Sequence, residues 1–286
     1  QGGLSINGGS SGQVVHSSIS GGVVAGAGAS DWLLRFNQIS GGVALRIDGG
    51  SAWNVRDNRI TGDAAGLRIA QAATGVFADN VISARTVALD ILAVFGGAIE
   101  RNDFQGAVTG VNYGVAANLS ANRIHGNTIG VASGIDNPAQ ALGFFNASAL
   151  PNQIYGNVTG VLLTNARVQN QHIHDNQAGV AGSGRVGGDS LELANLIEGN
   201  ATGIGNFSGT IQFNRLSAND TAIAATSEQR ILHNLFYRNS GFGVLIDGRN
   251  DVRIFNNTFY APQGDNLRRV KSVVENAHIV AAIDQH

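Results

Sequence analysis

The chain repeats a short pattern of polar and apolar positions about every 22 residues. In each repeat, an asparagine or glutamine is followed two positions later by an apolar side chain. The amide positions are Asn37, Asn58, Asn80, Asn102, Asn122, Asn152, Gln171, Asn195, Asn214, Asn234 and Asn257. The apolar positions are Ile39, Ile60, Ile82, Phe104, Ile124, Ile154, Ile173, Ile197, Leu216, Phe236 and Phe259. An internal period of this length predicts a repeat protein in which each repeat forms one structural unit.

Each repeat contains two further apolar elements. Residues 42–47, GVALRI, follow a turn and alternate apolar and polar side chains, which is the pattern of a strand. A third apolar position lies three residues before the amide, for example at Leu34 and Val55. Turns rich in Gly, Asn, Ser and Asp, such as Gly126-Asn127, separate these elements. We therefore expect three short strands per repeat and no helices.

A repeat of three short strands cannot bury its apolar face alone, but parallel stacking of repeats buries it. The pattern therefore predicts an all-β fold, a single-stranded parallel β-helix of about 11–12 turns over residues 1–262. The amide side chains are expected to face inward and to hydrogen-bond along the stack as an Asn ladder, in a residue type that also tolerates left-handed turns. Residues 263–286 break the repeat and are predicted to cap the last turn or to link onward.

Two segments interrupt the repeat and are expected to form loops. The predicted insertions are residues 132–150 and a smaller one at residues 181–190. Loops that leave a solenoid often carry its binding site. Phe144 and Phe145 in the first insertion would stack on a sugar ring, or else bury themselves under the loop.

Several strings along residues 14–262 resemble the right-handed parallel β-helix repeat family. They include NRITG, NRIHGNTIGV, NQIYGNVTGV and VRIFNNTFY. The resemblance implies a right-handed β-helix similar to pectate lyases, polygalacturonases, alginate lyases and epimerases, phage tailspikes and surface adhesin domains. The Gly/Ser-rich start, QGGLSINGGSSGQ, resembles the passenger regions of bacterial surface adhesins. A secreted or cell-surface location is therefore expected.

The outer face of the Asn-x-Ile strand provides the candidate site, because the residues one and three positions after the amide point outward. From His125 onward, these positions are rich in imidazole, phenol, guanidinium and carboxylate groups. The stripe comprises Arg123, His125, Tyr155, His172, His174, Glu198, Arg215, Tyr237 and Tyr260. Repetition at the strand spacing of ~4.8 Å suits an extended polysaccharide. We expect a ligand track that Phe144 and Phe145 extend.

A catalytic centre is the alternative use of the same stripe. Arg123 would neutralise a uronate carboxylate and so acidify the C5–H, while His172, His174 or Tyr155 would remove and return a proton. Exposed strand positions also favour Tyr and Arg for packing alone. No Asp-Asp pair and no Asp-Pro-His motif occurs, and the only lysine is Lys271. No catalytic motif of the family is thus found.

Composition limits cofactors and partners. The chain has no Cys, so thiolate metal sites are excluded, and no cofactor is expected. Asp57 and Asp79 occupy the same place in successive repeats with Arg101 next, which leaves a calcium site or a salt-bridged ladder open. A net charge of −2 gives no footprint for nucleic acid. No apolar run is long enough for membrane insertion.

Two classes of function remain open. The first is a non-catalytic extracellular rod, a piece of a larger secreted protein since the chain has no Met, with a structural or glycan-binding, adhesin-like role. The second is a polysaccharide lyase, epimerase or glycoside hydrolase. The expected partners are a polysaccharide or surface glycan, other domains of the same polypeptide, or further copies in a fibre.

Overall fold

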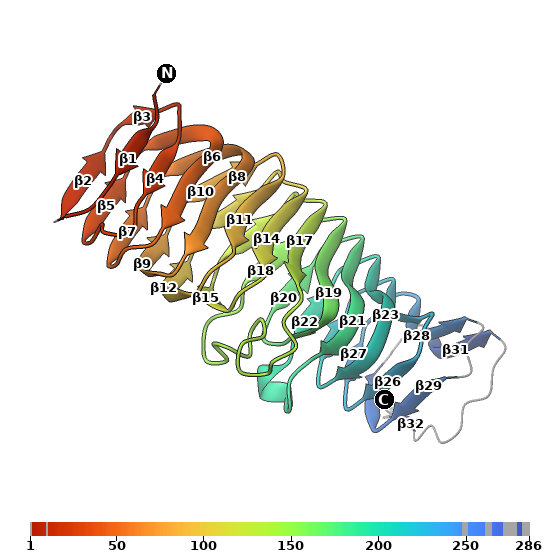
Figure 1. The fold of residues 1–286 in the computed structure, drawn as a ribbon. Helices are drawn as coiled ribbons and strands as arrows, with labels where there is room; N and C mark the ends of the chain where they lie inside the picture. The colour runs from red at the N-terminus through yellow and green to blue at the C-terminus, as the bar shows by residue number, and fades with distance from the viewer. Residues whose placement is uncertain (1, 10, 248–250, 261–264, 271–278, 282–286) are drawn as a thin grey trace. The chain divides into compact units, whose positions relative to one another are not determined.

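The computed structural model describes residues 2–9, 11–247, 251–260, 265–270 and 279–281. It is an all-β parallel β-solenoid of about 11 turns with ~22 residues per turn, which confirms the fold predicted from the repeat. Two compact units are present, Gln1–Ile135 with Ser148–Gln153, and Asp136–Ala147 with Ile154–His286. Each unit is a stack of turns whose strands form three rows (Figure 1). Row A carries the Asn-x-Ile strands, and rows B and C follow it in each turn.

The rows of the first unit are parallel throughout. Row A consists of β3 (Ser18–Ile19), β6 (Gln38–Asp48), β8 (Arg59–Gln71), β10 (Val81–Ala84), β13 (Asp103–Gln105) and β16 (Arg123–His125). Row B consists of β1 (Leu4–Ile6), β4 (Val23–Ala25), the later parts of β6 and β8, β11 (Val87–Ile91), β14 (Thr109–Tyr113) and β17 (Ile129–Ser133). Row C consists of β2 (Gly12–Val15), β5 (Trp32–Arg35), β7 (Trp53–Arg56), β9 (Ala73–Ala78), β12 (Phe95–Glu100) and β15 (Ala117–Ser120).

The second unit repeats this arrangement. Row A consists of β18 (Gln153–Tyr155), whose first residue belongs to the first unit, β20 (His172–His174), β22 (Leu196–Glu198), β24 (Arg215–Ser217), β27 (Leu235–Tyr237), β30 (Asn257–Tyr260) and β32 (Ile279–Ala281). Row B consists of β19 (Thr159–Val168), β21 (Ala178–Val186), β23 (Thr202–Gln212), β25 (Thr221–Ala225), β28 (Phe242–Asp247) and β31 (Asp265–Val270). Row C consists of the later parts of β19, β21 and β23, followed by β26 (Gln229–Leu232) and β29 (Val252–Phe255).

Each inward apolar residue packs on its counterpart in the next turn. Ile60 pairs in register with Ile39 on one side and Ile82 on the other, and all three are buried. In the second unit the rings of Phe236 and Phe259 stack with centroids 4.5 Å apart. Full burial of such a side chain contributes about 1.5–3 kcal/mol. The strict apolar position two residues after each amide therefore reflects a continuous core.

The predicted Asn ladder is present at the corner between rows C and A. The Oδ1 of Asn58 accepts hydrogen bonds from the backbone N–H and the Nδ2 of Asn37, both at 3.0 Å. Its own Nδ2 donates to the Leu34 carbonyl at 2.8 Å and to Asn80 Oδ1 at 2.9 Å. Each buried amide thus satisfies backbone groups that the corner leaves unpaired. The left-handed residue at this corner is the one before the amide, for example Asp57, rather than the asparagine itself.

A second Asn ladder occupies the corner between rows A and B. Asn176, Asn200 and Asn219 are buried, and each Oδ1 accepts from the backbone N–H and Nδ2 of the asparagine one turn earlier. The residue before each asparagine is left-handed, as at Gly156 and Gly199. The Gly-Asn pairs that we assign to turns from the sequence are therefore turns whose asparagine also faces the core.

The loops and the tail deviate from the plain repeat. The first insertion contains Leu142, which bridges to Val168 of β19 within the second unit. In the segment 181–190, the first six residues lie in β21, so the loop itself covers residues 187–194 and contains a 3-10 turn, η1 (Leu191–Leu193). In the predicted cap, β31 and β32 pair with β28 and β30, and the rest of residues 263–286 lies outside the described residues. No helix among the described residues has the length and apolar character needed to cross a membrane.

A buried tyrosine gives a prediction for alkaline pH. Tyr113 is fully buried, and its hydroxyl donates to the Ala117 carbonyl (3.1 Å) and accepts from the Ala117 N–H (3.2 Å). Burial raises the pKa of Tyr113 from 10.0 to about 12, and the Ala117 hydrogen bond lowers it by less. The raised pKa means that burying the neutral phenol stabilises the fold below pH ~10 and that this stabilisation is lost as pH rises through about 12.

We therefore expect one tyrosine to ionise only near pH 12 in a spectrophotometric titration, together with unfolding of the first unit. Tyr113→Phe should remove that late ionisation and lower the free energy of unfolding by about 1–3 kcal/mol, because the Ala117 backbone groups lose their partner. A variant titration that still contains the late step would contradict the assignment.

Candidate functional site

Row A of the second unit carries a cluster of imidazole, phenol and carboxylate groups on its outer face. In β20, His172 and His174 flank the fully buried Ile173, so both imidazoles project outward. The parallel register places His174 opposite Glu198 of β22, and Glu198 opposite Ser217 of β24. We call such a set of residues, in register on successive strands, a column. Tyr155 of β18 completes the cluster. We call Tyr155, His172, His174, Glu198 and Ser217 the row A cluster.

The aromatic rings of this cluster stack on one another. The Tyr155 and His174 rings lie nearly parallel, with centroids 4.9 Å apart and an interplanar angle of 9°. The His172 and His174 rings are 4.3 Å apart and tilted by 35°. The imidazole side chains remain 20% (His174) and 23% (His172) exposed. Because the faces of the stacked rings cover each other, the edges of the rings, rather than their faces, point towards solvent.

Carboxylates hold both imidazoles in place. His172 Nε2 lies 2.7 Å from Glu198 Oε1, and Glu198 Oε2 accepts a hydrogen bond from the Ser217 hydroxyl at 3.2 Å. His174 Nδ1 lies 2.7 Å from Asp175 Oδ2. An ionised carboxylate only accepts hydrogen bonds, so these contacts place a proton on Nε2 of His172 and on Nδ1 of His174. Asp175, which sequence reasoning missed, directly follows β20 and could have been found as the acid next to the His-x-His pair.

The corresponding positions of the first unit form an ion-pair group within that unit. Asp103 of β13 contacts both outward residues of β16, with Arg123 Nη2 at 2.6 Å and His125 Nε2 at 2.7 Å from its carboxylate oxygens. The register pairs Asp103 directly with Arg123. Arg123 and His125 thus have a carboxylate partner inside the first unit. The predicted grouping of Arg123 with the tyrosine and histidines of the second unit stays a prediction.

The remaining predicted residues lie further along the second unit. Arg215 occupies the His172 column two strands away and is exposed. Tyr237 and Tyr260 continue the Glu198 column in register, and Tyr260 is 39% exposed. Their role in ligand binding stays a prediction.

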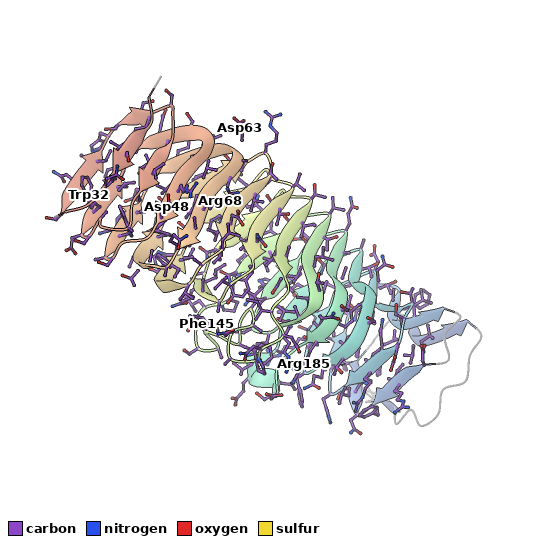
Figure 2. The ribbon with its side chains drawn as sticks, viewed as in Figure 1. Trp32, Asp48, Asp63, Arg68, Phe145 and Arg185 are labelled. Carbon is purple, nitrogen blue, oxygen red and sulfur yellow. The ribbon has the colours of Figure 1, made fainter. Side chains whose placement is uncertain are left out.

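The two phenylalanines of the first insertion differ in exposure. Phe144 is half-buried, and its ring centre lies 5.9 Å from the Arg185 guanidinium carbon. Phe145 is 44% exposed (both Phe145 and Arg185 are labelled in Figure 2). The Phe144 ring therefore packs near the Arg185 guanidinium group of β21.

The aspartates considered for calcium make ion pairs. Asp57 accepts from Arg35 Nε at 2.8 Å, and Asp79 accepts from Arg101 Nε at 3.0 Å. The hydrogen bond to Asp79, followed by the one to Glu100, raises the pKa of Arg101 above its ordinary value. Within the described ranges, no group of three or more His, Asp or Glu side chains is arranged to hold a metal ion.

Comparison with known proteins yields likenesses of fold. No family model matches the sequence. No curated protein matches it either. Among solved structures, parallel β-helices of the mannuronan C-5 epimerase class are similar. The AlgE4 A-module of Azotobacter vinelandii has a TM-score of 0.41 and 18% identity, over 96% of this chain and 82% of that chain. The AlgE6 A-module of the same organism has a TM-score of 0.37 and 18% identity, over 99% of this chain and 82% of that chain.

Proposed function

We propose that the second unit binds a polysaccharide along the outer face of row A without turning it over. The observation that supports this proposal is the row A cluster, in which Tyr155, His174, His172 and Glu198 form one continuous, partly exposed row across three adjacent strands. Neighbouring strands are ~4.8 Å apart, so an extended glycan lying across them would meet one strand per sugar. The proposal extends to a secreted or cell-surface location, where such glycans occur.

The row suits hydroxyl groups better than apolar faces. The rings of Tyr155 and His174 cover each other, so a glycan would meet the edges of these rings rather than their faces. Asp175 and Glu198 fix the two imidazoles before any ligand arrives. Side chains that are already held in place lose little conformational entropy on binding, which favours affinity.

Binding without turnover fits the charges of this face. Removal of a proton beside a uronate carboxylate requires a cation that neutralises the carboxylate. In the second unit, Arg215 occupies the His172 column, but it lies two strands away, at a backbone separation of ~10 Å. Each imidazole instead has a carboxylate beside it, which would repel a uronate. Neutral or weakly acidic glycans are therefore the expected ligands of row A.

A second candidate, acid–base catalysis on a polysaccharide, is favoured by one contact. His172 Nε2 lies 2.7 Å from Glu198 Oε1, a contact that orients the imidazole, and Tyr155 lies in the same row as a potential proton donor. The two candidates differ in what Tyr155→Phe does, because that change retains the ring and removes only the ionisable hydroxyl.

The test combines a glycan array with titration calorimetry on the best array ligand. We expect His174→Asn to weaken binding at least tenfold and the matched change His233→Asn to alter it less than twofold. His233 is an imidazole of the same unit that stacks on Phe213 away from this cluster, at a left-handed position that asparagine tolerates. Equal affinity of wild type and His174→Asn would refute a site at row A.

Turnover is followed in the same samples through unsaturated-uronate absorbance and exchange of sugar C–H protons with D2O. We expect neither signal. Product formation that Tyr155→Phe abolishes, with binding retained, would establish the catalytic candidate in place of binding alone.

A further inference from the structure

Row C of the second unit carries an arginine at the same outward position on four of five successive strands. The register pairs Arg167 of β19 with Arg185 of β21, Arg185 with Thr210 of β23, and Thr210 with Arg230 of β26. Arg253 of β29 follows Arg230 in the same column. Adjacent members are therefore one strand spacing, ~4.8 Å, apart at the backbone. Like charges at such positions repel each other, so the column is unfavourable unless anions accompany it.

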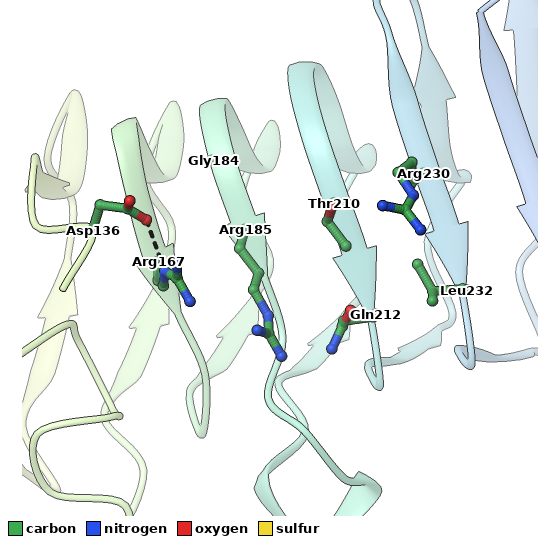
Figure 3. Close-up of a pocket in the computed structure, with 8 residues that line it drawn as sticks. All are labelled: Asp136, Arg167, Gly184, Arg185, Thr210, Gln212, Arg230 and Leu232. Atoms are coloured by element: carbon green, nitrogen blue, oxygen red, sulfur yellow. Dashed lines mark hydrogen bonds and ion pairs between the residues drawn. The ribbon is translucent and has the colours of Figure 1, made fainter. Parts of the chain in front are cut away.

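Three of these arginines line a pocket of about 350 Å³. Figure 3 shows Arg167 and Arg185 on neighbouring strands and Arg230 further along the same face, with Thr210 and Gln212 on the strand between Arg185 and Arg230. The volume lies at the lower end of the range for small-ligand sites, ~300–1,000 Å³. Guanidinium, hydroxyl and amide groups thus converge on a space that fits one or two sugar units.

Two of the guanidinium groups are fixed by loop residues. Asp136 of the first insertion accepts from Arg167 Nε at 2.7 Å. Arg185 Nη2 donates to the Gly188 carbonyl at 2.8 Å and contacts Asp189, both in the loop 187–194. Both aspartates are mostly exposed, whereas the two arginines are largely covered. The loops therefore orient the arginines and hold them ready for a ligand.

The guanidinium group of Arg230 remains available to a ligand in this pocket. Arg185 Nε has no hydrogen-bond partner within the part of the chain that the structure describes, but this atom is buried and lies out of a ligand's reach. Arg230 is exposed, and its side chain forms no ion pair or hydrogen bond with any described residue. Among the described residues, Asp136 is the one acid that lines the pocket beside three arginines, so the lining carries a positive excess.

We propose that this pocket binds the carboxylate or sulfate groups of an acidic glycan, with the polymer running across row C from Arg167 towards Arg253. Guanidinium groups recognise such planar or tetrahedral anions through paired N–H donors. Thr210 and Gln212 hydrogen-bond the sugar hydroxyls, and Leu232 contacts a sugar face. This site lies on a different row of strands from the row A cluster and does not depend on it.

The test measures calorimetric affinity for a galacturonate oligomer and a heparin oligosaccharide, with a neutral cello-oligosaccharide for comparison. Arg230→Gln is the main variant, because Arg230 is exposed and its loss leaves no ion-pair partner behind among the described residues. Arg59→Gln, at an exposed arginine of the first unit, makes the same change in net charge and is the matched control. We expect Arg230→Gln to weaken binding of at least one anionic oligomer tenfold or more, and Arg59→Gln to weaken it less than twofold.

Several outcomes test whether the row C pocket binds an acidic glycan. Preference for galacturonate or for heparin identifies the carboxylate or the sulfate as the recognised group, and added NaCl should weaken either complex. Equal binding of the neutral oligomer, no binding of either anionic oligomer, or equal losses in Arg230→Gln and Arg59→Gln would overturn the proposal. His174→Asn should leave this binding unchanged. Loss of binding in His174→Asn alone would place the acidic ligand at row A and contradict the row C site.

Discussion

Replacing the buried Asn214 by aspartate is expected to lower the free energy of unfolding by about 3–5 kcal/mol at pH 7. Asn214 is 0% exposed. Its Nδ2 donates to the Val186 carbonyl, the Gln212 carbonyl and Asn234 Oδ1, each at 3.0 Å. A carboxylate has no donor, so Asn214→Asp would press negative oxygen atoms against three acceptors and leave the ladder broken at one turn.

The size of this loss should depend on pH. Burial without a cationic partner raises the pKa of the introduced aspartate in the folded state above its usual ~3.9. A raised folded-state pKa means that the protonated form, which keeps one O–H donor, is the better tolerated one. The variant therefore retains most stability below pH ~4 and loses it as pH rises through the folded-state pKa.

Asn165→Asp is the matched control for this change. Asn165 is exposed, and its amide oxygen accepts a hydrogen bond from the Ser183 hydroxyl at 2.9 Å across neighbouring strands of the same unit. Because a carboxylate accepts the same bond in solvent, we expect a change below about 1 kcal/mol. Urea unfolding followed by circular dichroism at pH 4 and pH 7 measures both variants. Equal losses in the two would mean that the ladder contributes no more than a surface contact.

The Asn ladder also explains why the fold can be predicted from the sequence. Ile60 and Asn58 each meet the same residue type one turn away, so neither position varies freely, and the period appears at every turn. The second ladder is harder to recognise. Asn127 and Asn157 follow glycine, a pair typical of simple turns, and nothing in the pair itself shows that the amide faces inward.

Some strands are longer in the structure than the three short strands per repeat that the sequence predicts. In β6 and β8 the strands of rows A and B run together without a break, and in β19, β21 and β23 those of rows B and C do. Gly182 and Gly184 adopt positive φ values inside β21, which lets the chain bend there without leaving the sheet. A sequence pattern of strand, glycine and strand does not distinguish this bend from a turn.

The sequence predicts which residues of the candidate site share the outer face of row A. It does not predict which of their side chains contact one another. The two-residue alternation of row A places His172, His174 and Glu198 on the outer face, and the observed register agrees. Which carboxylate holds which imidazole depends on side-chain rotamers, so the contact of Asp175 with His174 does not follow from the pattern. Register alone also cannot decide whether the stacked rings serve a ligand.

The row C arginines have a partial signal in the sequence. Arg167, Arg230 and Arg253 each lie four residues before a ladder amide, as does Thr210. Arg185 lies ten residues before Asn195, because the loop 187–194 intervenes. Because of this longer spacing, a search for arginines at a fixed distance from the amide does not find Arg185. The parallel pairing of β21 with β19 and β23 shows that Arg185 belongs to the same column.

Replacing Gly75 by alanine is expected to destabilise the first unit by about 3–5 kcal/mol, the sum of backbone strain and a steric clash. Gly75 of β9 has φ +151°, a value that side-chain-bearing residues rarely adopt. It pairs with Trp53 of β7 and Gly97 of β12 in consecutive turns. A Cβ at Gly75 would lie 2.6 Å from the Trp53 backbone nitrogen and would also meet the Trp53 carbonyl oxygen. Neither atom can move away, because both belong to the paired backbone of row C.

Two control variants separate the strain from the clash. Gly106→Ala tests backbone strain alone, because Gly106 has φ +71° and no atom of a described residue lies within 4 Å of the position that a Cβ would occupy, so a loss of about 1–2 kcal/mol is expected. Gly42→Ala has neither feature and should be neutral or slightly stabilising. Urea unfolding of the three variants gives the ranking. If Gly75→Ala were no more harmful than Gly106→Ala, the close approach of adjacent turns at row C would be looser than the register of β7, β9 and β12 implies.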